Sequence, residues 1–89
     1  MPHPNGIVIH PGVEIGPNCL IFQQVTIGGG EGGTPTIGGH VDIGAGAKIF
    51  GAVRIGNHAR IGANAVVLSD VPDGRTAVGV PAEIVRQRT

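Results

Sequence analysis

Branched aliphatic residues recur at every sixth position along most of this sequence. A period of six does not fit the 3.6-residue period of an amphipathic helix. Glycine often follows the aliphatic residue directly, as at Gly16, Gly38 and Gly56. This pattern suits a short strand followed by a turn, with the large aliphatic side chain always pointing inward. The two series are Ile9, Ile15, Ile21, Ile27 and then Ile37, Ile43, Ile49, Ile55, Ile61, Val67.

Three hexapeptides make one triangular coil, so the sequence predicts an all-β fold, a single-stranded parallel β-helix. Residues 18 apart then lie above one another, with parallel strands about 4.8 Å apart. The predicted inward columns are Ile9, Ile27, Ile49, Val67; Ile15, Ile37, Ile55; and Ile21, Ile43, Ile61.

Ile37 begins the second series ten positions after Ile27, a spacing of one hexapeptide plus four residues. We therefore expect one protruding loop at about 28–36. The repeat fades near residue 70, so we expect a non-repeat tail at about 70–89 in a single domain, 1–89.

A chain of 89 residues buries only about 60–65% of its unfolded surface, and Cys19 alone forms no internal disulfide. We therefore expect the chain to gain further stability by oligomerisation. Apolar residues also flank the core positions on the outside, and a contiguous apolar patch usually marks an interface. Packing of flat prism faces as a homotrimer would cover them: Leu20, Phe22, Phe50, Val66 and Leu68.

Charge and hydropathy exclude several partners. Six Lys and Arg balance six Asp and Glu, so the chain lacks the cationic field that nucleic acid or an anionic membrane requires. It has neither the pattern of a signal peptide nor a run of 18 apolar residues. We expect a cytoplasmic protein with no nucleic-acid or membrane partner.

The repeat resembles that of the left-handed β-helix acyltransferases. The segments GIVIHPGVEIG, IFQQVTIGG, IGAGAKIFGAVRIG, HARIGANAVVL and AVGVPAEIV are similar to the catalytic domain of serine acetyltransferases in particular. The left hand of the coil is implied by this resemblance alone. It also implies acetyl transfer from acetyl-CoA to the hydroxyl of a small acceptor, in a cytoplasmic trimer of cysteine biosynthesis.

Such a transfer needs a base for the alcohol proton, a task that imidazole suits at neutral pH. The resemblance implies His3, which stands three residues before Gly6-Ile7-Val8 and twelve before Ile15. A frayed terminal residue is the alternative interpretation of His3. His10 is a candidate second active-site histidine or a surface turn residue.

The resemblance also implies a CoA site made largely of backbone along a groove between prisms. Gly28 and Gly29 would lie next to the thioester, where an N–H can stabilise an oxyanion. Ala45 and Ala63 fall on pantetheine-contacting positions, and Arg60 matches a basic position for a CoA phosphate. The alternatives are a plain turn requirement for the glycines and a solvated arginine.

His40 and His58 are 18 residues apart and should stack at one corner of the prism with Asn18. A solvated ladder is the favoured interpretation, and we expect no metal. A zinc carbonic anhydrase on the same fold would use three histidines from two subunits, but its His-x4-His pair is missing here.

Several positions depart from the serine acetyltransferase pattern. Pro2 replaces an aspartate before the base, Gly33-Thr34 replaces an Arg-His pair that holds the serine carboxylate, and an upstream orienting acid precedes the start of the chain. Glu83 replaces a basic residue, a role that Arg86 would have to take. The acceptor therefore stays open among serine, a sugar hydroxyl and another small alcohol. A non-catalytic trimeric scaffold or shortened paralogue is the main alternative function.

Overall fold

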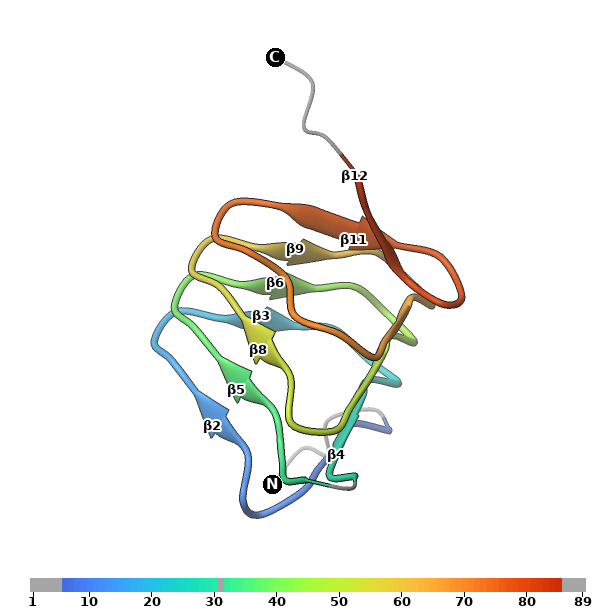
Figure 1. The fold of residues 1–89 in the computed structure, drawn as a ribbon. Helices are drawn as coiled ribbons and strands as arrows, with labels where there is room; N and C mark the ends of the chain where they lie inside the picture. Colours follow the sequence, from blue (N-terminus) through green and yellow to red (C-terminus); the bar gives the residue numbers. More distant parts are fainter. Residues whose placement is uncertain (1–5, 31, 86–89) are drawn as a thin grey trace.

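The computed structural model describes residues 6–30 and 32–85, which form strands and turns without a helix (Figure 1). No helix able to span a membrane occurs in these ranges. The strands are β1 (Val8–Ile9), β2 (Glu14–Ile15), β3 (Leu20–Ile21), β4 (Thr26–Gly28), β5 (Thr36–Ile37), β6 (Asp42–Ile43), β7 (Lys48–Phe50), β8 (Arg54–Ile55), β9 (Arg60–Ile61), β10 (Val66–Val67), β11 (Thr76–Val78) and β12 (Glu83–Val85).

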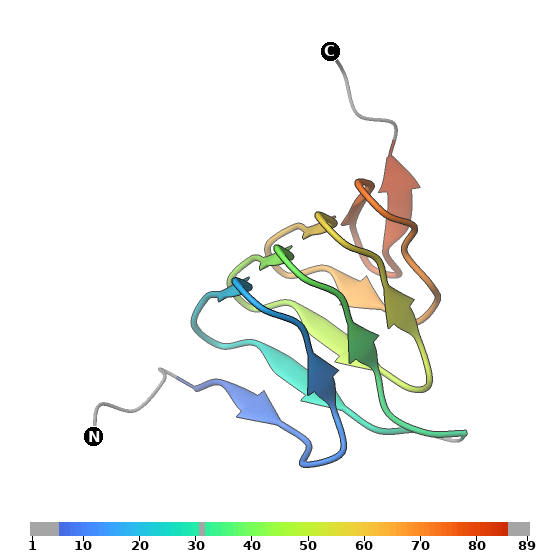
Figure 2. The ribbon, with the colours of Figure 1, turned by 90° about the vertical axis from the view of Figure 1, so that its left-hand side faces the viewer.

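The strands form three sheets that are the faces of a triangular prism. The first face is β1, β4, β7 and β10, and the second is β2, β5 and β8. The third face is β3, β6, β9 and β11, with β12 added at its end. All pairs are parallel except β11 with β12. The chain winds around this prism as a left-handed parallel β-helix (Figures 1 and 2), which confirms the predicted fold class.

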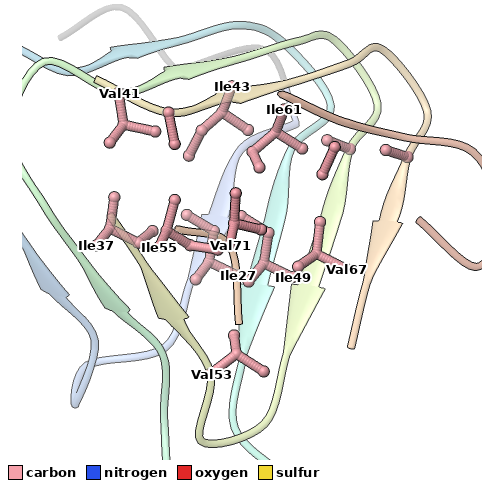
Figure 3. Close-up of a cluster of buried hydrophobic side chains, with 14 of the residues drawn as sticks. Ile27, Ile37, Val41, Ile43, Ile49, Val53, Ile55, Ile61, Val67 and Val71 are labelled. Carbon is pink, nitrogen blue, oxygen red and sulfur yellow. The ribbon is translucent and has the colours of Figure 1, made fainter. Parts of the chain in front are cut away.

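The register confirms the three predicted inward columns. Ile9 pairs with Ile27, Ile27 with Ile49 and Ile49 with Val67 on the first face. The columns of Ile15 and Ile21 continue in the same way on the other two faces. Figure 3 shows the aliphatic side chains converging on the prism axis. A second layer of small residues fills the corners of this core: Val25, Val41, Ala47, Val53, Ala59 and Ala65.

The two ends of the prism differ in burial. In the first coil, Ile9 keeps 39% of its surface exposed although it occupies an inward position, because none of the described strands stacks beneath β1. At the other end, Val67, Val71 and Ala77 are buried. Here the chain folds back, the Ala82 N–H donates to the Val66 carbonyl at 2.8 Å, and Ala82 packs against the core.

The structure describes most of the loop and the chain from residue 70 to residue 85. The loop leaves the first face after β4 and returns at β5, and a bridge between Gly30 and Gly33 closes it. The stretch expected to be a non-repeat tail instead continues the coil: Val71 pairs with Ile55, and β11 adds to the third face. The repeat is obscured there because Val71 comes only four positions after Val67 and because Ala77 replaces the branched aliphatic residue.

Each corner of the prism has its own backbone character. The corner between the first and second faces carries the loop, and we call it the loop corner. At the corner between the second and third faces, Asn18, His40 and His58 adopt positive φ values of 61°, 59° and 61°, and we call it the histidine corner. Gln24 and Asn64 do the same between the third and first faces. We call this the groove corner.

Candidate active site

A shallow apolar groove runs along the third face next to the groove corner. Its volume is about 300 Å³. Two glycines form its floor, because Gly44 and Gly62 directly follow β6 and β9 in the same outward column. Phe22 stands at one end of this column, with half of its surface exposed. The lining residues are Phe22, Asp42, Ile43, Gly44, Arg60, Ile61, Gly62 and Thr76.

The predicted pantetheine positions border this groove. Ala45 follows Gly44 and Ala63 follows Gly62 at the turn of the corner. The backbone holds the two turns together, since the Asn64 N–H donates to the Ala45 carbonyl at 2.8 Å. A Cβ on Gly44 would lie 2.7 Å from the Ala63 nitrogen, so glycine is required there for coil stacking. The small residues at this corner leave the coil edges accessible to an extended ligand.

Arg60 lies on the rim of the groove and has a partner within the chain. Its Nε lies 4.0 Å from the Asp42 carboxylate, and both side chains are largely exposed. An exposed pair of this length stabilises the fold little. The guanidinium is therefore free to exchange Asp42 for another anion, including a phosphate.

Gly28 and Gly29 lie at the loop corner, where their lack of a side chain makes room for neighbours. A Cβ on Gly28 would meet the Phe50 ring at 3.1 Å, and one on Gly29 would lie 3.2 Å from Thr34 Cγ2. Neither residue has the positive φ of the loop glycines Gly32 and Gly33. A turn requirement therefore does not explain these two glycines, whereas close packing does.

His10 lies at the same corner, one coil below Gly28. The Gly12 N–H donates to its Nδ1 at 3.1 Å. The Thr34 hydroxyl of the loop donates to the Gly12 carbonyl at 3.0 Å. The turn after β1 and the protruding loop are thus joined through Gly12. The sequence raised His10 as a candidate but gave no sign of this connection, because it depends on how the loop returns to β5.

The predicted base, His3, lies outside the described residues. Pro2, a departure from the serine acetyltransferase pattern, and Arg86, the residue expected to take over from Glu83, also lie outside them. Glu83 is exposed in β12. Gly33-Thr34, another departure, lies in the loop, where Thr34 is half-buried and tethered to Gly12.

The histidine corner carries the expected ladder. The rings of His40 and His58 stack in parallel, with centroids 4.8 Å apart and planes 3° from parallel. A hollow of about 540 Å³ lies beside them, away from both other corners. No group of three or more His, Cys, Asp or Glu residues in the described ranges is arranged to hold a metal ion.

Cys19 has the surroundings of a structural residue. Its thiol is half-buried and donates to the Gly38 carbonyl at 3.2 Å, one coil above. It also packs against the core. This placement agrees with its predicted small-residue position.

The predicted site residues fall on two different corners of the prism. Gly28 ends β4 and Gly29 follows it at the loop corner, whereas Ala45 and Ala63 come after β6 and β9 at the groove corner, and the first face separates the two corners. One prism therefore does not bring the two sets together. Phe22, Gly44 and Gly62 were not identified as groove residues from the sequence. The six-residue period does place them in one outward column, so this signal was available.

Comparison with known proteins gives a consistent assignment. No protein-family model matches the chain. The serine acetyltransferase of Helicobacter pylori strain J99 is 49% identical over 87 residues, which are 93% of this chain and 51% of that protein. That of Mycobacterium tuberculosis H37Rv is 46% identical over 89 residues, 96% of this chain and 39% of that protein. The chain thus spans about half or less of the length of these relatives.

Solved structures agree with the sequence comparison. A serine acetyltransferase in complex with CoA superposes with a TM-score of 0.85 at 49% identity, over 90% of this chain and 34% of that one. A complex with cysteine gives a TM-score of 0.87 at 46% identity, over 91% and 35%.

The fold, the repeat and these relatives identify the chain as a left-handed β-helix like those of the hexapeptide-repeat acyltransferase superfamily. Within that superfamily, the chain is a homologue of the serine acetyltransferases over nearly its whole length.

Proposed function

We propose that this chain transfers an acetyl group from acetyl-CoA to the hydroxyl of a small acceptor, with serine the first candidate. The carrying observation is the groove corner: an apolar groove floored by Gly44 and Gly62 lies beside Ala45 and Ala63, in a chain 49% identical to a serine acetyltransferase solved with CoA. Pantetheine is an extended, mostly apolar arm, and a groove with backbone at its edges suits it.

The proposed chemistry is direct transfer without an acyl-enzyme. His3 takes the proton of the acceptor hydroxyl while that oxygen attacks the acetyl carbonyl carbon. A C–O bond forms, the C–S bond breaks, and CoA leaves as a thiolate that is then protonated. A backbone N–H at Gly29 stabilises the oxyanion of the tetrahedral intermediate. Cys19 takes no part because its thiol is engaged with the Gly38 carbonyl.

A homotrimer is part of the proposal. Leu20, Phe22 and Leu68 each expose more than half of their surface. Leu20 lies on the third face, Phe22 lies next to the groove corner, and Leu68 lies at the loop corner. If the groove corner of one prism meets the loop corner of its neighbour, Ala45 and Ala63 of one subunit and Gly28 and Gly29 of the next line one cleft. The placement of the two residue sets on different corners supports this arrangement.

A non-catalytic trimer is the second candidate. It is favoured by the loop, in which Gly33-Thr34 stands where the resemblance implies an Arg-His pair, and by Glu83 in place of a basic residue. Binding of acetyl-CoA separates the two candidates, because a scaffold without a donor site has no reason to retain the groove.

Titration calorimetry with acetyl-CoA tests the donor site directly. Ala63→Trp places a large ring at the exposed edge of the groove corner, and we expect it to abolish CoA binding while the β-rich circular dichroism stays unchanged. Pro17→Trp, at the exposed histidine corner, is the matched control and should bind CoA like the parent. Equal affinity in Ala63→Trp and the parent would remove the CoA site from this corner.

A further inference from the structure

The outward column at the loop corner contains one polar side chain. Register places His10, Gly28, Phe50 and Leu68 above one another at the ends of the first-face strands. The His10 N–H donates to the Ile27 carbonyl at 2.8 Å, which fixes His10 directly beside Gly28. Because Gly28 has no side chain, the Phe50 ring packs over it, 3.1 Å from the place of a Cβ on Gly28, and the His10 imidazole is exposed in the same column.

The imidazole of His10 is held in one orientation although it is exposed. Its Nδ1 accepts from the Gly12 N–H, and a neutral imidazole that accepts at Nδ1 carries its proton at Nε2. Its Cδ2 edge faces the loop, 3.9 Å from the place of a Cβ on Gly29. The tether from Thr34 to Gly12 keeps loop and ring together. The result is an oriented N–H donor beside the proposed oxyanion position.

The loop itself offers no cation to an acceptor. Residues 28–36 include neither lysine nor arginine, and Thr34 uses its hydroxyl proton on the Gly12 carbonyl. A polar acceptor that enters between the loop and the first coil therefore meets the exposed His10 imidazole, whereas Arg54 borders the other side of the loop, in a hollow with Thr34 and Thr36.

We propose that the Nε2–H of His10 donates a hydrogen bond to an oxygen of the acceptor and so helps to select it. This inference rests on the proposed acetyl transfer and names a specificity residue for it. The bound oxygen belongs to a carboxylate or to a second hydroxyl. A carboxylate oxygen and a hydroxyl oxygen can each accept this hydrogen bond. Acceptors that contain only one of these two groups distinguish between them.

Two substitutions separate the acceptor role of Nδ1 in the His10 ring from the donor role of Nε2. In His10→Asn, the side-chain oxygen still accepts from the Gly12 N–H, but no donor remains at the Nε2 position. In His10→Gln, the longer amide carries an N–H to about that position. His58→Asn is the matched control, because it removes an exposed imidazole at the histidine corner, where asparagine suits the positive φ of 61°.

Steady-state kinetics of the full chain with acetyl-CoA and serine, serinamide or a sugar alcohol provide the test. His10→Asn should raise the acceptor KM roughly 10-fold to 100-fold if the oxygen is a carboxylate, and roughly 3-fold to 10-fold if it is a hydroxyl. The KM for acetyl-CoA should not change, and His10→Gln should recover most of the loss. A loss with serine but not with serinamide assigns the carboxylate, and a loss with the sugar alcohol assigns a second hydroxyl.

Ring ¹⁵N spectra supply a readout that needs no turnover. We expect His10 to show the Nε2–H tautomer and to shift when the acceptor is added, while His58 does not move. An Nδ1–H tautomer, or an unchanged acceptor KM in His10→Asn with the parent active, overturns the inference and leaves acetyl transfer standing. A parent that binds no CoA and acetylates none of the acceptors overturns the proposed function itself.

Discussion

His3 is the candidate base of the proposed reaction, and Cys19 is the only thiol in the sequence that could form an acyl-enzyme instead. Cys19 is half-buried and donates to carbonyls of its own and the next coil, so its thiol serves the packing between coils. General-base catalysis contributes about 10²-fold to 10⁴-fold. We therefore expect His3→Ala to lower kcat by roughly that factor, with CoA affinity unchanged by calorimetry.

Cys19→Ala is the control for an acyl-enzyme mechanism. It should retain nearly the full kcat, with at most a modest loss of thermal stability from the lost hydrogen bonds. Full activity in His3→Ala, measured with an acceptor that the parent turns over, would contradict the assignment of the base and direct attention to His10.

The sequence predicted the burial of individual residues correctly where the six-residue period determines which side chains point inward. The inward residues Ile27, Ile43 and Ile49 are completely buried, as a six-residue period requires. The partial exposure of Ile9 did not follow from the period, because burial depends on whether another coil lies beneath. The contacts of His10 and Thr34 could not be predicted from the sequence either, because the conformation of the loop does not follow the six-residue period.

The strands of this fold are only two or three residues long, so the turns between them carry much of its specificity. Gly44 shows this most clearly: a Cβ there would lie 2.7 Å from the Ala63 nitrogen and 3.0 Å from the Gly62 carbonyl carbon. These are backbone atoms of the next coil and cannot rotate away. Gly44→Ala should therefore separate two coils and destabilise the protein by about 2 to 3 kcal/mol.

Gly74→Asn is the matched control for this element. Gly74 has a φ of 71° and open space around its Cα, and asparagine already occupies such positions at Asn18 and Asn64. We expect its stability to stay within about 1 kcal/mol of the parent. Denaturant unfolding of both variants at one protein concentration measures the difference, and equal midpoints would show that the coils adapt to the added methyl group.

Element boundaries followed from the sequence as far as the repeat did. The four extra residues between Ile27 and Ile37 correctly predicted the loop. The closing coil was harder to recognise, because it shortens one side of the triangle to four residues and uses Ala77 where the period calls for a branched aliphatic residue. The antiparallel β12 breaks the parallel order altogether, and the hexapeptide pattern contains no signal for it.

For the whole molecule, the decisive property is that the two halves of the proposed site lie on different corners of one prism. If neighbouring subunits combine them, a defect at the groove corner and a defect at the loop corner can complement each other. Ala63→Trp fills the first corner, and Gly29→Trp fills the second. Each variant alone should form trimers in sedimentation equilibrium yet lack acetyl transfer, because every cleft contains the defect.

Mixed trimers distinguish a shared cleft from one within a single subunit. When the two variants are co-expressed in equal amounts, about a quarter of the clefts combine an intact groove corner with an intact loop corner, so about a quarter of the parental activity should return. If each subunit held a complete site, every site would retain one defect and no activity would return. Two Ala63→Trp chains that differ only in their purification tags serve as the control for co-expression. Their mixed trimers should stay inactive, because the defective groove corner is then present in every cleft.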